Sequence, residues 1–233
     1  YISVAVVILF ANTMVNKIKG NLINIVLLVI AIAALLLSGK RGMLVAIAVA
    51  IVVVTILYLY DQKKLKFGQF LVFLVGTLAV YYMIMYTDIA ENIIRRSEYG
   101  DDFLSGRDVI WTRAMEGIRK NPIFGNGTGS YSLIHTSSVH NSFLHAWYEN
   151  GLIGLVLLVG AMFAAGFAGV SALRKCKNPR NKGYVLAALS YQIFFAVACF
   201  TDHLMQYNSL MACYFIFAAV PYVAVTQEKQ EKI

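Results

Sequence analysis

The sequence predicts an all-α protein, a polytopic bundle of about seven transmembrane helices with one extracytoplasmic segment. Hydrophobic residues make up 59% of the 233 residues, and charged residues make up 14%, whereas soluble domains carry about 25% charged residues. Several apolar runs approach or exceed the ~18 residues that cross a bilayer as a helix. Short clusters of Lys and Arg separate many of these runs, as they do in multi-pass membrane proteins.

Seven apolar stretches account for the expected spans. They are residues 1–15, 21–38, 43–60, 67–86, 142–172, 183–201 and 208–226. The fifth is long enough to include an interfacial turn before the span itself. The chain begins at Tyr1 inside an apolar stretch, so we expect residues 1–233 to form one transmembrane domain, the C-terminal part of a larger protein.

The charges between the spans predict the orientation. The stretches "NKIKGN", "DQKKLK", "LRKCKNPRNK" and "QEKQEKI" fall on one side and hold twelve Lys and Arg against three acids. The opposite side holds eight cations and nine acids. Cytoplasmic loops collect Lys and Arg, so the first side is predicted to be cytoplasmic. Topology therefore explains the net charge of +8, and no nucleic-acid partner is expected.

Residues 87–141 form the one sizeable extracytoplasmic segment. Within it, "RDVIWTRAMEGIRKNP" predicts an amphipathic helix with Val109, Trp111, Met115 and Ile118 on its apolar face. The loop "GNGTGSYS" follows, and a tight turn explains its glycines better than a phosphate cradle, because it fits no phosphate-binding motif. The three cysteines lack metal-type spacing. We expect no metal and no cofactor.

Three side chains indicate a reaction at the outer face. Arg41 lies in the turn "SGKRG", Arg107 opens the amphipathic helix, and His140 precedes the fifth span. A guanidinium binds a diphosphate bidentately, and an imidazole takes a proton from a hydroxyl near neutral pH. This set suits a lipid-linked sugar diphosphate: the arginines stabilise the leaving group while His140 activates the attacking hydroxyl.

These residues lie in a pattern that resembles the O-antigen ligase and polymerase superfamily of bacterial membrane glycosyltransferases. The pattern is "SGKRGML", then "SGRDVIWTRAMEGIRKNPIFGNGTGSYS", then "HNSFLHAWYENGLIGLVLLV", over about residues 38–160. The resemblance implies transfer of a lipid-diphosphate-linked oligosaccharide to a second glycan, without metal and with inversion at the anomeric carbon. It also implies that Arg41 and Arg107 bind the diphosphate and that His140 is the base. Members usually have more spans than this chain.

The resemblance leads us to expect a polymerase that joins undecaprenyl-diphosphate-linked repeat units of an O-antigen, capsule or exopolysaccharide. A ligase that transfers the glycan to lipid A core or another acceptor uses the same groups and remains an alternative. A transporter or flippase for lipid diphosphate is the non-enzyme alternative, and a structural membrane subunit is a third. The expected place is the bacterial cytoplasmic membrane, with the site on the extracytoplasmic side. The expected partners are the lipid-linked donor, a glycan acceptor and a chain-length regulator.

Five further residues are expected to contact the substrate. Asn141 follows His140, Gly127 lies in the glycine-rich loop, and Arg95 and Arg96 precede the acidic stretch "SEYGDD". The two arginines either steer the anionic donor or pair with the acids that follow them. His203 lies at the outer end of the sixth span. Its neighbouring aspartate either orients it as a base, or both residues simply end the helix.

Overall fold

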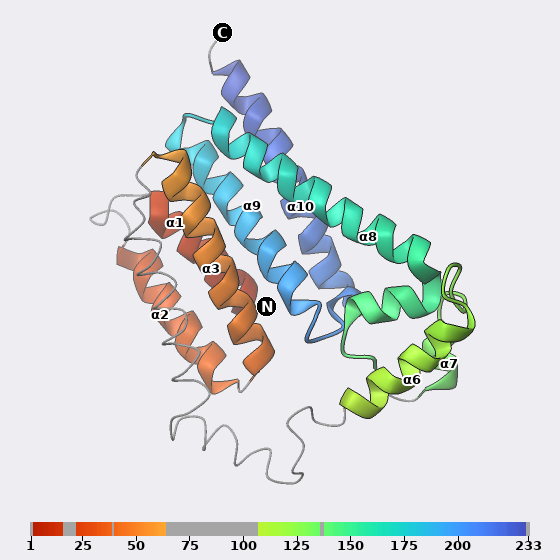
Figure 1. Ribbon diagram of the computed structural model, residues 1–233. Helices are drawn as coiled ribbons and strands as arrows, with labels where there is room; N and C mark the ends of the chain where they lie inside the picture. The colour runs from red at the N-terminus through yellow and green to blue at the C-terminus, as the bar shows by residue number, and fades with distance from the viewer. Residues whose placement is uncertain (1, 16–21, 39, 64–106, 136–137, 232–233) are drawn as a thin grey trace.

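The computed structural model describes residues 2–15, 22–38, 40–63, 107–135 and 138–231, and over these residues every regular element is a helix. Figure 1 shows how the helices are arranged. They are α1 (Ile2–Val15), α2 (Leu22–Leu37), α3 (Arg41–Asp61), α6 (Arg107–Lys120), α7 (Ser130–Ile134), α8 (Ser142–Lys175), α9 (Pro179–Ala198), the 3₁₀ turn η2 (Leu204–Gln206) and α10 (Asn208–Gln230).

This helical bundle confirms the predicted fold class. Six of the seven predicted spans correspond to helices, and the remaining one, residues 67–86, lies outside the described residues, as do Arg95 and Arg96. Among the helices described, three are long and apolar enough to cross a bilayer, namely Gly42–Asp61, Ser142–Lys175 and Asn208–Gln230, while α1 and α2 are shorter apolar helices. The chain is therefore a multi-pass membrane protein.

Helix α9 is the central element and packs against α1, α3, α8 and α10. It begins earlier than the predicted residue 183, because Asn178 caps the backbone N–H of Arg180 and Pro179 occupies the first turn. Two of its buried polar side chains bond to backbone: Ser190 donates to the carbonyl of Leu186, and Gln192 donates to that of Phe217. These bonds let a helix with polar side chains occupy the middle of the bundle.

The ends of four helices meet at the end of the bundle that the charges predict to be cytoplasmic. Here α3, α8 and α10 end and α9 begins (Figure 1). The ammonium group of Lys182 pairs with Asp61 at the end of α3. Glu228 is buried, and its carboxylate accepts the backbone N–H groups of Lys177 and Asn178 and the side-chain amide of Asn181. These contacts join the end of α3 and the end of α10 to the start of α9 and the connection that precedes it.

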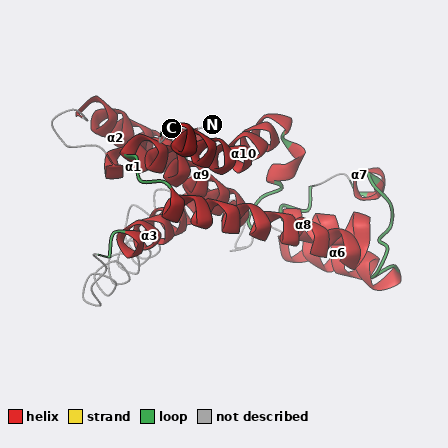
Figure 2. Ribbon diagram, turned by 90° about the horizontal axis from the view of Figure 1, so that it is seen from above, coloured by secondary structure: helices red, strands yellow, loops and turns green. Residues whose placement is uncertain are grey.

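Helix α8 is kinked at Gly151, which has φ 66° and ψ −172°. The kink separates the first turns of the helix from the long apolar part, as the length of this stretch predicted. Helices α6 and α7 pack on the first part, and Figure 2 shows this unit at the opposite side of the molecule from α1 and α2. The unit has its own apolar cluster: Ala114, Ile118, Tyr131, Val139 and Tyr148.

The predicted apolar face of α6 was partly wrong. Trp111, Met115 and Ile118 pack into the cluster, but Val109 is 49% exposed. The buried ridge follows i, i+4 steps through Ala114 and Ile118, and a residue nine positions before Ile118 points to the opposite side of a helix with 100° per residue. The sequence spacing was therefore misread at one position.

Candidate functional site

The site lies at the end of the bundle opposite the basic loops, where α3, α8 and α10 begin and α9 ends. Gly42 in the first turn of α3 approaches the turn after α9 so closely that a Cβ atom there would lie 2.5 Å from Oγ1 of Thr201. Arg41 is the first residue of α3, so its backbone lies beside Thr201 and Asp202. The side chain of Arg41 is outside the described part of the chain.

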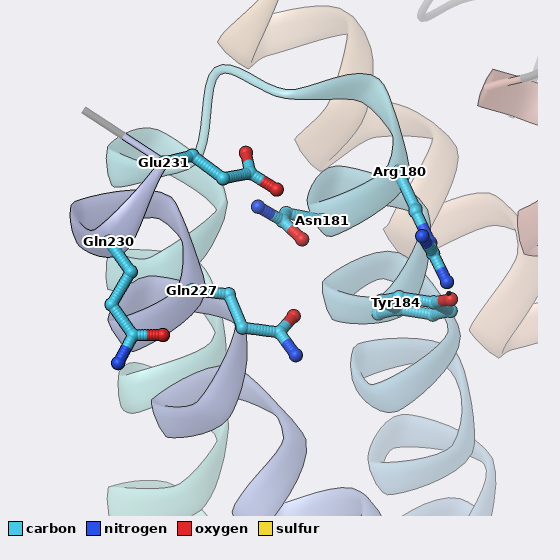
Figure 3. Close-up of a pocket in the computed structure, with 6 residues that line it drawn as sticks. All are labelled: Arg180, Asn181, Tyr184, Gln227, Gln230 and Glu231. Carbon is cyan, nitrogen blue, oxygen red and sulfur yellow. Dashed lines mark hydrogen bonds between the residues drawn. The ribbon is translucent and has the colours of Figure 1, made fainter. Parts of the chain in front are cut away.

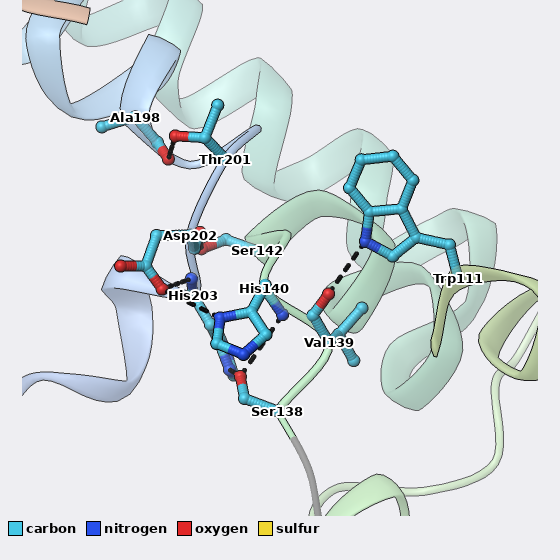
Figure 4. A network of polar contacts seen from close by, with 9 residues as sticks. All are labelled: Trp111, Ser138, Val139, His140, Ser142, Ala198, Thr201, Asp202 and His203. Atoms are coloured by element: carbon cyan, nitrogen blue, oxygen red, sulfur yellow. Dashed lines mark hydrogen bonds and ion pairs between the residues drawn. The ribbon is translucent and has the colours of Figure 1, made fainter. Parts of the chain in front are cut away.

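His140 is paired with a carboxylate. Its Nδ1 atom lies 3.5 Å from Oδ1 of Asp202, and the two side chains are 41% and 22% exposed. The same Asp202 oxygen accepts the backbone N–H of His203 at 2.8 Å, as Figure 4 shows. Of the two alternatives for Asp202, the geometry does not support the one in which it orients His203 as a base, because the carboxylate contacts the ring of His140 and only the main chain of His203.

The backbone of His140 has a positive φ of 52°, which is uncommon for a residue with a Cβ and costs free energy. Four hydrogen bonds hold the segment in place. Trp111 donates its indole N–H to the carbonyl of Val139 at 2.9 Å, and the N–H of His140 donates to Oγ of Ser138 at 3.4 Å. The side-chain oxygen of Asn141 caps α8 by accepting two backbone N–H groups at 3.0 and 2.9 Å.

Arg107 reaches this region through α6. It lies one turn before Trp111, so both residues share a face of the helix about 6 Å apart along its axis. Because Trp111 bonds to the carbonyl that precedes His140, the start of α6 lies beside the His140 segment. Arg107 is half-buried. Arg107 therefore lies on a helix whose first turns bond to the segment before His140. Arg41 lies next to Gly42, which contacts Thr201 in the turn after α9.

The glycine-rich loop is locked against the kink in α8. Gly125 and Gly151 both have positive φ, and a Cβ on either would fall within 2.6 Å of backbone atoms of the other. The N–H of Asn126 donates to the carbonyl of Tyr148, and that of Gly127 to the carbonyl of Glu149. Gly127 has φ 96°. These contacts support the turn interpretation, and a substrate contact by Gly127 stays a prediction.

A second group of ionisable side chains adjoins His140, and sequence reasoning missed most of it. The rings of His145 and His203 stack with centroids 4.0 Å apart. Nε2 of His145 lies 3.3 Å from Oε1 of Glu149, and that buried carboxylate also accepts the N–H of Tyr131 at 3.3 Å. The i, i+4 spacing of His145 and Glu149 was a usable signal, but the sequence alone does not show that His203 joins them.

His203 is buried between the other histidines and Asp202. Burial, followed by the nearby His145, lowers the pKa of His203 from 6.5 to about 4, although Asp202 opposes this shift. Loss of solvation disfavours the charged imidazolium. His203 is therefore neutral near pH 7, and its ring Nδ1 lies 3.5 Å from Oγ of Ser138.

These residues face a cavity of about 790 Å³ between α7, the first part of α8 and the α9–α10 connection. We name it the histidine cavity, because His135, His145 and His203 line it together with Tyr131, Ser138 and Glu149. Sequence reasoning gave His135 no role. Within the described residues, no group of three or more His, Cys, Asp and Glu side chains could hold a metal ion.

A smaller cavity of about 410 Å³ lies at the basic end of the molecule. It is formed by the start of α9 and the end of α10, and Figure 3 shows its lining side chains, among them Arg180, Tyr184 and Gln227. Arg180 donates to the hydroxyl of Tyr184 at 2.9 Å. This cavity is at the opposite end of α9 and α10 from His140 and His203.

Comparisons with known proteins agree with the arrangement of these motifs. A family model described as O-antigen ligase matches residues 26–159, which is more than half of the chain and includes Arg41, Arg107 and His140. The chain is also 23% identical over 167 residues to an uncharacterized protein of Haemophilus influenzae. That match covers 60% of this chain and 41% of the relative, so the chain spans less than half of the relative's length.

Proposed function

The chain belongs to the O-antigen ligase family, and from that premise we propose that it is a glycosyltransferase that polymerises a polysaccharide. The donor is a repeat unit linked to undecaprenyl diphosphate at the outer face of the bacterial cytoplasmic membrane. The acceptor is a second lipid-linked repeat unit. The polysaccharide is an O-antigen, a capsule or an exopolysaccharide. The ends of α3, α8 and α10 and the start of α9, which are predicted to be cytoplasmic, lie at the opposite end of the bundle from His140. This arrangement supports an extracytoplasmic site.

One observation supports this proposal: the ring of His140 is paired with Asp202 at 3.5 Å. The helix that begins with Arg107 bonds through Trp111 to the carbonyl before His140. Gly42, next to Arg41, contacts Thr201, the neighbour of Asp202. A partly exposed imidazole next to a carboxylate is suited to take up a proton and hold the resulting positive charge. The two arginines come from separate helices, so they are able to approach a diphosphate from different sides. A flippase needs the cations but not the titratable base.

The proposed reaction is a single displacement. A hydroxyl of the acceptor sugar attacks the anomeric carbon of the donor, its proton passes to His140, and the bond between that carbon and the diphosphate oxygen breaks. Lipid diphosphate leaves with the bonding electrons, and the configuration at the anomeric carbon inverts. Arg41 and Arg107 stabilise the charge that develops on the leaving oxygen. Asp202 stabilises the His140 imidazolium.

The test uses the full-length protein in liposomes with purified lipid-linked repeat units. We expect wild-type protein to give a ladder of lipid-linked products on a gel, whereas a ligase gives single transfer to an added acceptor. His140→Gln is expected to lower the rate about 100-fold or more, the usual contribution of a general base. Undiminished transfer by His140→Gln would refute the base assignment.

Arg107 has a matched control on the same helix. Arg107→Gln is expected to weaken binding of undecaprenyl diphosphate about 10- to 100-fold, since a hydrogen bond to a charged group contributes about 1.5–3 kcal/mol. Arg119 lies exposed in the last turn of α6, and Arg119→Gln removes the same charge far from His140. Equal binding by the two variants would count against the diphosphate site.

A further inference from the structure

The histidine cavity adjoins His140 but is separate from the arginine side of the site. Ser138 connects the two: its Oγ atom accepts the N–H of His140 and lies 3.5 Å from Nδ1 of His203. Both Ser138 and His203 line the cavity. A molecule in the cavity therefore contacts Ser138, which itself bonds to the backbone of the proposed base His140. The volume of about 790 Å³ falls in the range of small-molecule sites.

The charge of the cavity does not suit a diphosphate. The described residues that line it include no Lys and no Arg, whereas diphosphate sites collect cations. Its one lining carboxylate, Glu149, is already engaged by the N–H of Tyr131 and by His145. Burial keeps His203 neutral near pH 7 by lowering its pKa. The cavity therefore favours an uncharged ligand.

The lining groups suit a ligand with many hydroxyls. The ring of Tyr131 is 2% exposed and packs against the ring of His135, with centroids 4.5 Å apart, so it supports the wall of the cavity. Asn150 and Gln206 are exposed at opposite sides of the lining, one on α8 and one on η2. Each amide offers both donors and an acceptor, as do the neutral imidazoles. These neutral donors and acceptors match the hydroxyls of a sugar.

We propose that the histidine cavity binds the acceptor glycan and delivers its terminal hydroxyl to His140. This inference rests on the proposed function, because it assigns the second substrate of that reaction. The anionic donor occupies the side that carries the arginines, and the uncharged acceptor occupies the side that carries the histidines. His140 lies at the boundary, where the proton is transferred.

The test separates sugar binding from diphosphate binding with two probes. One probe is the free oligosaccharide that mild acid releases from the cell's own lipid-linked repeat unit. Its binding to the full-length protein is measured by saturation-transfer NMR. The other is undecaprenyl diphosphate, which carries no sugar. Gln206→Trp places a bulky ring at the edge of the cavity, and Gln206→Ala removes the amide without adding bulk. Gln227→Trp is the matched control in the opposite cavity (Figure 3).

We expect Gln206→Trp to weaken oligosaccharide binding at least fivefold and to raise the KM for acceptor by a similar factor. Binding of undecaprenyl diphosphate and all properties of Gln227→Trp stay at wild-type values. Gln206→Ala gives a smaller loss in the same direction. If Gln206→Trp and Gln227→Trp bind oligosaccharide alike, the inference is overturned, whatever the transfer assay shows. If wild type binds oligosaccharide through the cavity but transfers nothing, the proposed function fails and the glycan site stands.

Discussion

Gly151→Ala tests how the loop 122–127 is attached to α8. Gly151 has φ 66° and ψ −172°, a region that is essentially accessible only to glycine. A Cβ atom at this position would lie 2.1 Å from the carbonyl oxygen of Ile123 and 2.6 Å from the backbone nitrogen of Gly125. Both neighbours are backbone atoms, so no side-chain rotation relieves the contact, and the loop itself must move.

The expected cost has two parts. The strained conformation costs about 1–3 kcal/mol in a residue with a Cβ. Moving the loop also weakens the bonds from the N–H of Leu152 to Pro122, 2.9 Å, and from the N–H of Gly127 to Glu149, 3.0 Å, at about 1 kcal/mol each. The total is about 3–5 kcal/mol. At about 2–4 °C per kcal/mol for a chain of this size, Tm falls by about 6–20 °C.

The assay is thermal unfolding of full-length protein followed by tryptophan fluorescence. The two tryptophans of the chain report on this unit, since Trp111 donates to Val139 and Trp147 donates to Pro122. Gly160→Ala is the control, because Gly160 lies in the same helix with no atom near its missing Cβ. There, replacing glycine favours the helix by up to about 1 kcal/mol. Equal Tm values for the two variants would refute the interlocked-glycine explanation.

Three further predictions concern the ends of the bundle. Asn141→Ala removes the cap of α8 and is expected to lower stability by about 1 kcal/mol, while Asn141→Asp keeps it; the Tm difference between the two variants measures the cap. Lys182→Met leaves Asp61 buried without its ammonium partner and is expected to cost about 3–5 kcal/mol, with partial recovery on adding Asp61→Asn in a double-mutant cycle. In the folded state, burial among His145, His140 and Asp202 lowers the pKa of His203 to about 4. The unfolded chain therefore binds this proton more readily. The contribution of the neutral His203 to stability is fully present above pH 6.5 and is lost as the pH falls toward 4. A Tm series over this range should flatten in His203→Gln, and an unchanged slope would contradict the burial of a neutral ring.

Most of the fold was predictable because the membrane imposes it. An apolar run of sufficient length must form a helix, since no other local structure satisfies its backbone in lipid. The ends of helices were less predictable. Helix α9 starts at Pro179 rather than 183, because a capping asparagine and proline extend it through polar residues. The face of α6 was misread at Val109 for a different reason: this residue lies nine positions before the buried Ile118 and so points to the opposite side of the helix.

The sequence singled out residues of the candidate site but not their pairings, and the chemical roles of these residues stay predictions. Sequence order singled out His140 because it is a histidine at the mouth of a span. It does not show that Asp202, 62 positions later, pairs with His140 and not with its neighbour His203. That pairing depends on where the C-terminal end of α9 meets the N-terminal end of α8. The same meeting buries His145 and Glu149 together, so the second histidine group is a tertiary feature.

The proposed function requires different surroundings for two histidines, the proposed base His140 and the cavity residue His203. A partly exposed His140 next to Asp202 is able to accept a proton and keep the charge. His203 is buried beside it with a lowered pKa, and the proposed acceptor site assigns its neutral ring to the binding of hydroxyls. If the two histidines exchanged surroundings, the cavity would hold a protonated His203, and a buried His140 would resist protonation. In the proposed mechanism, the difference in burial between these two histidines, which both approach Ser138, separates acceptor binding from proton transfer.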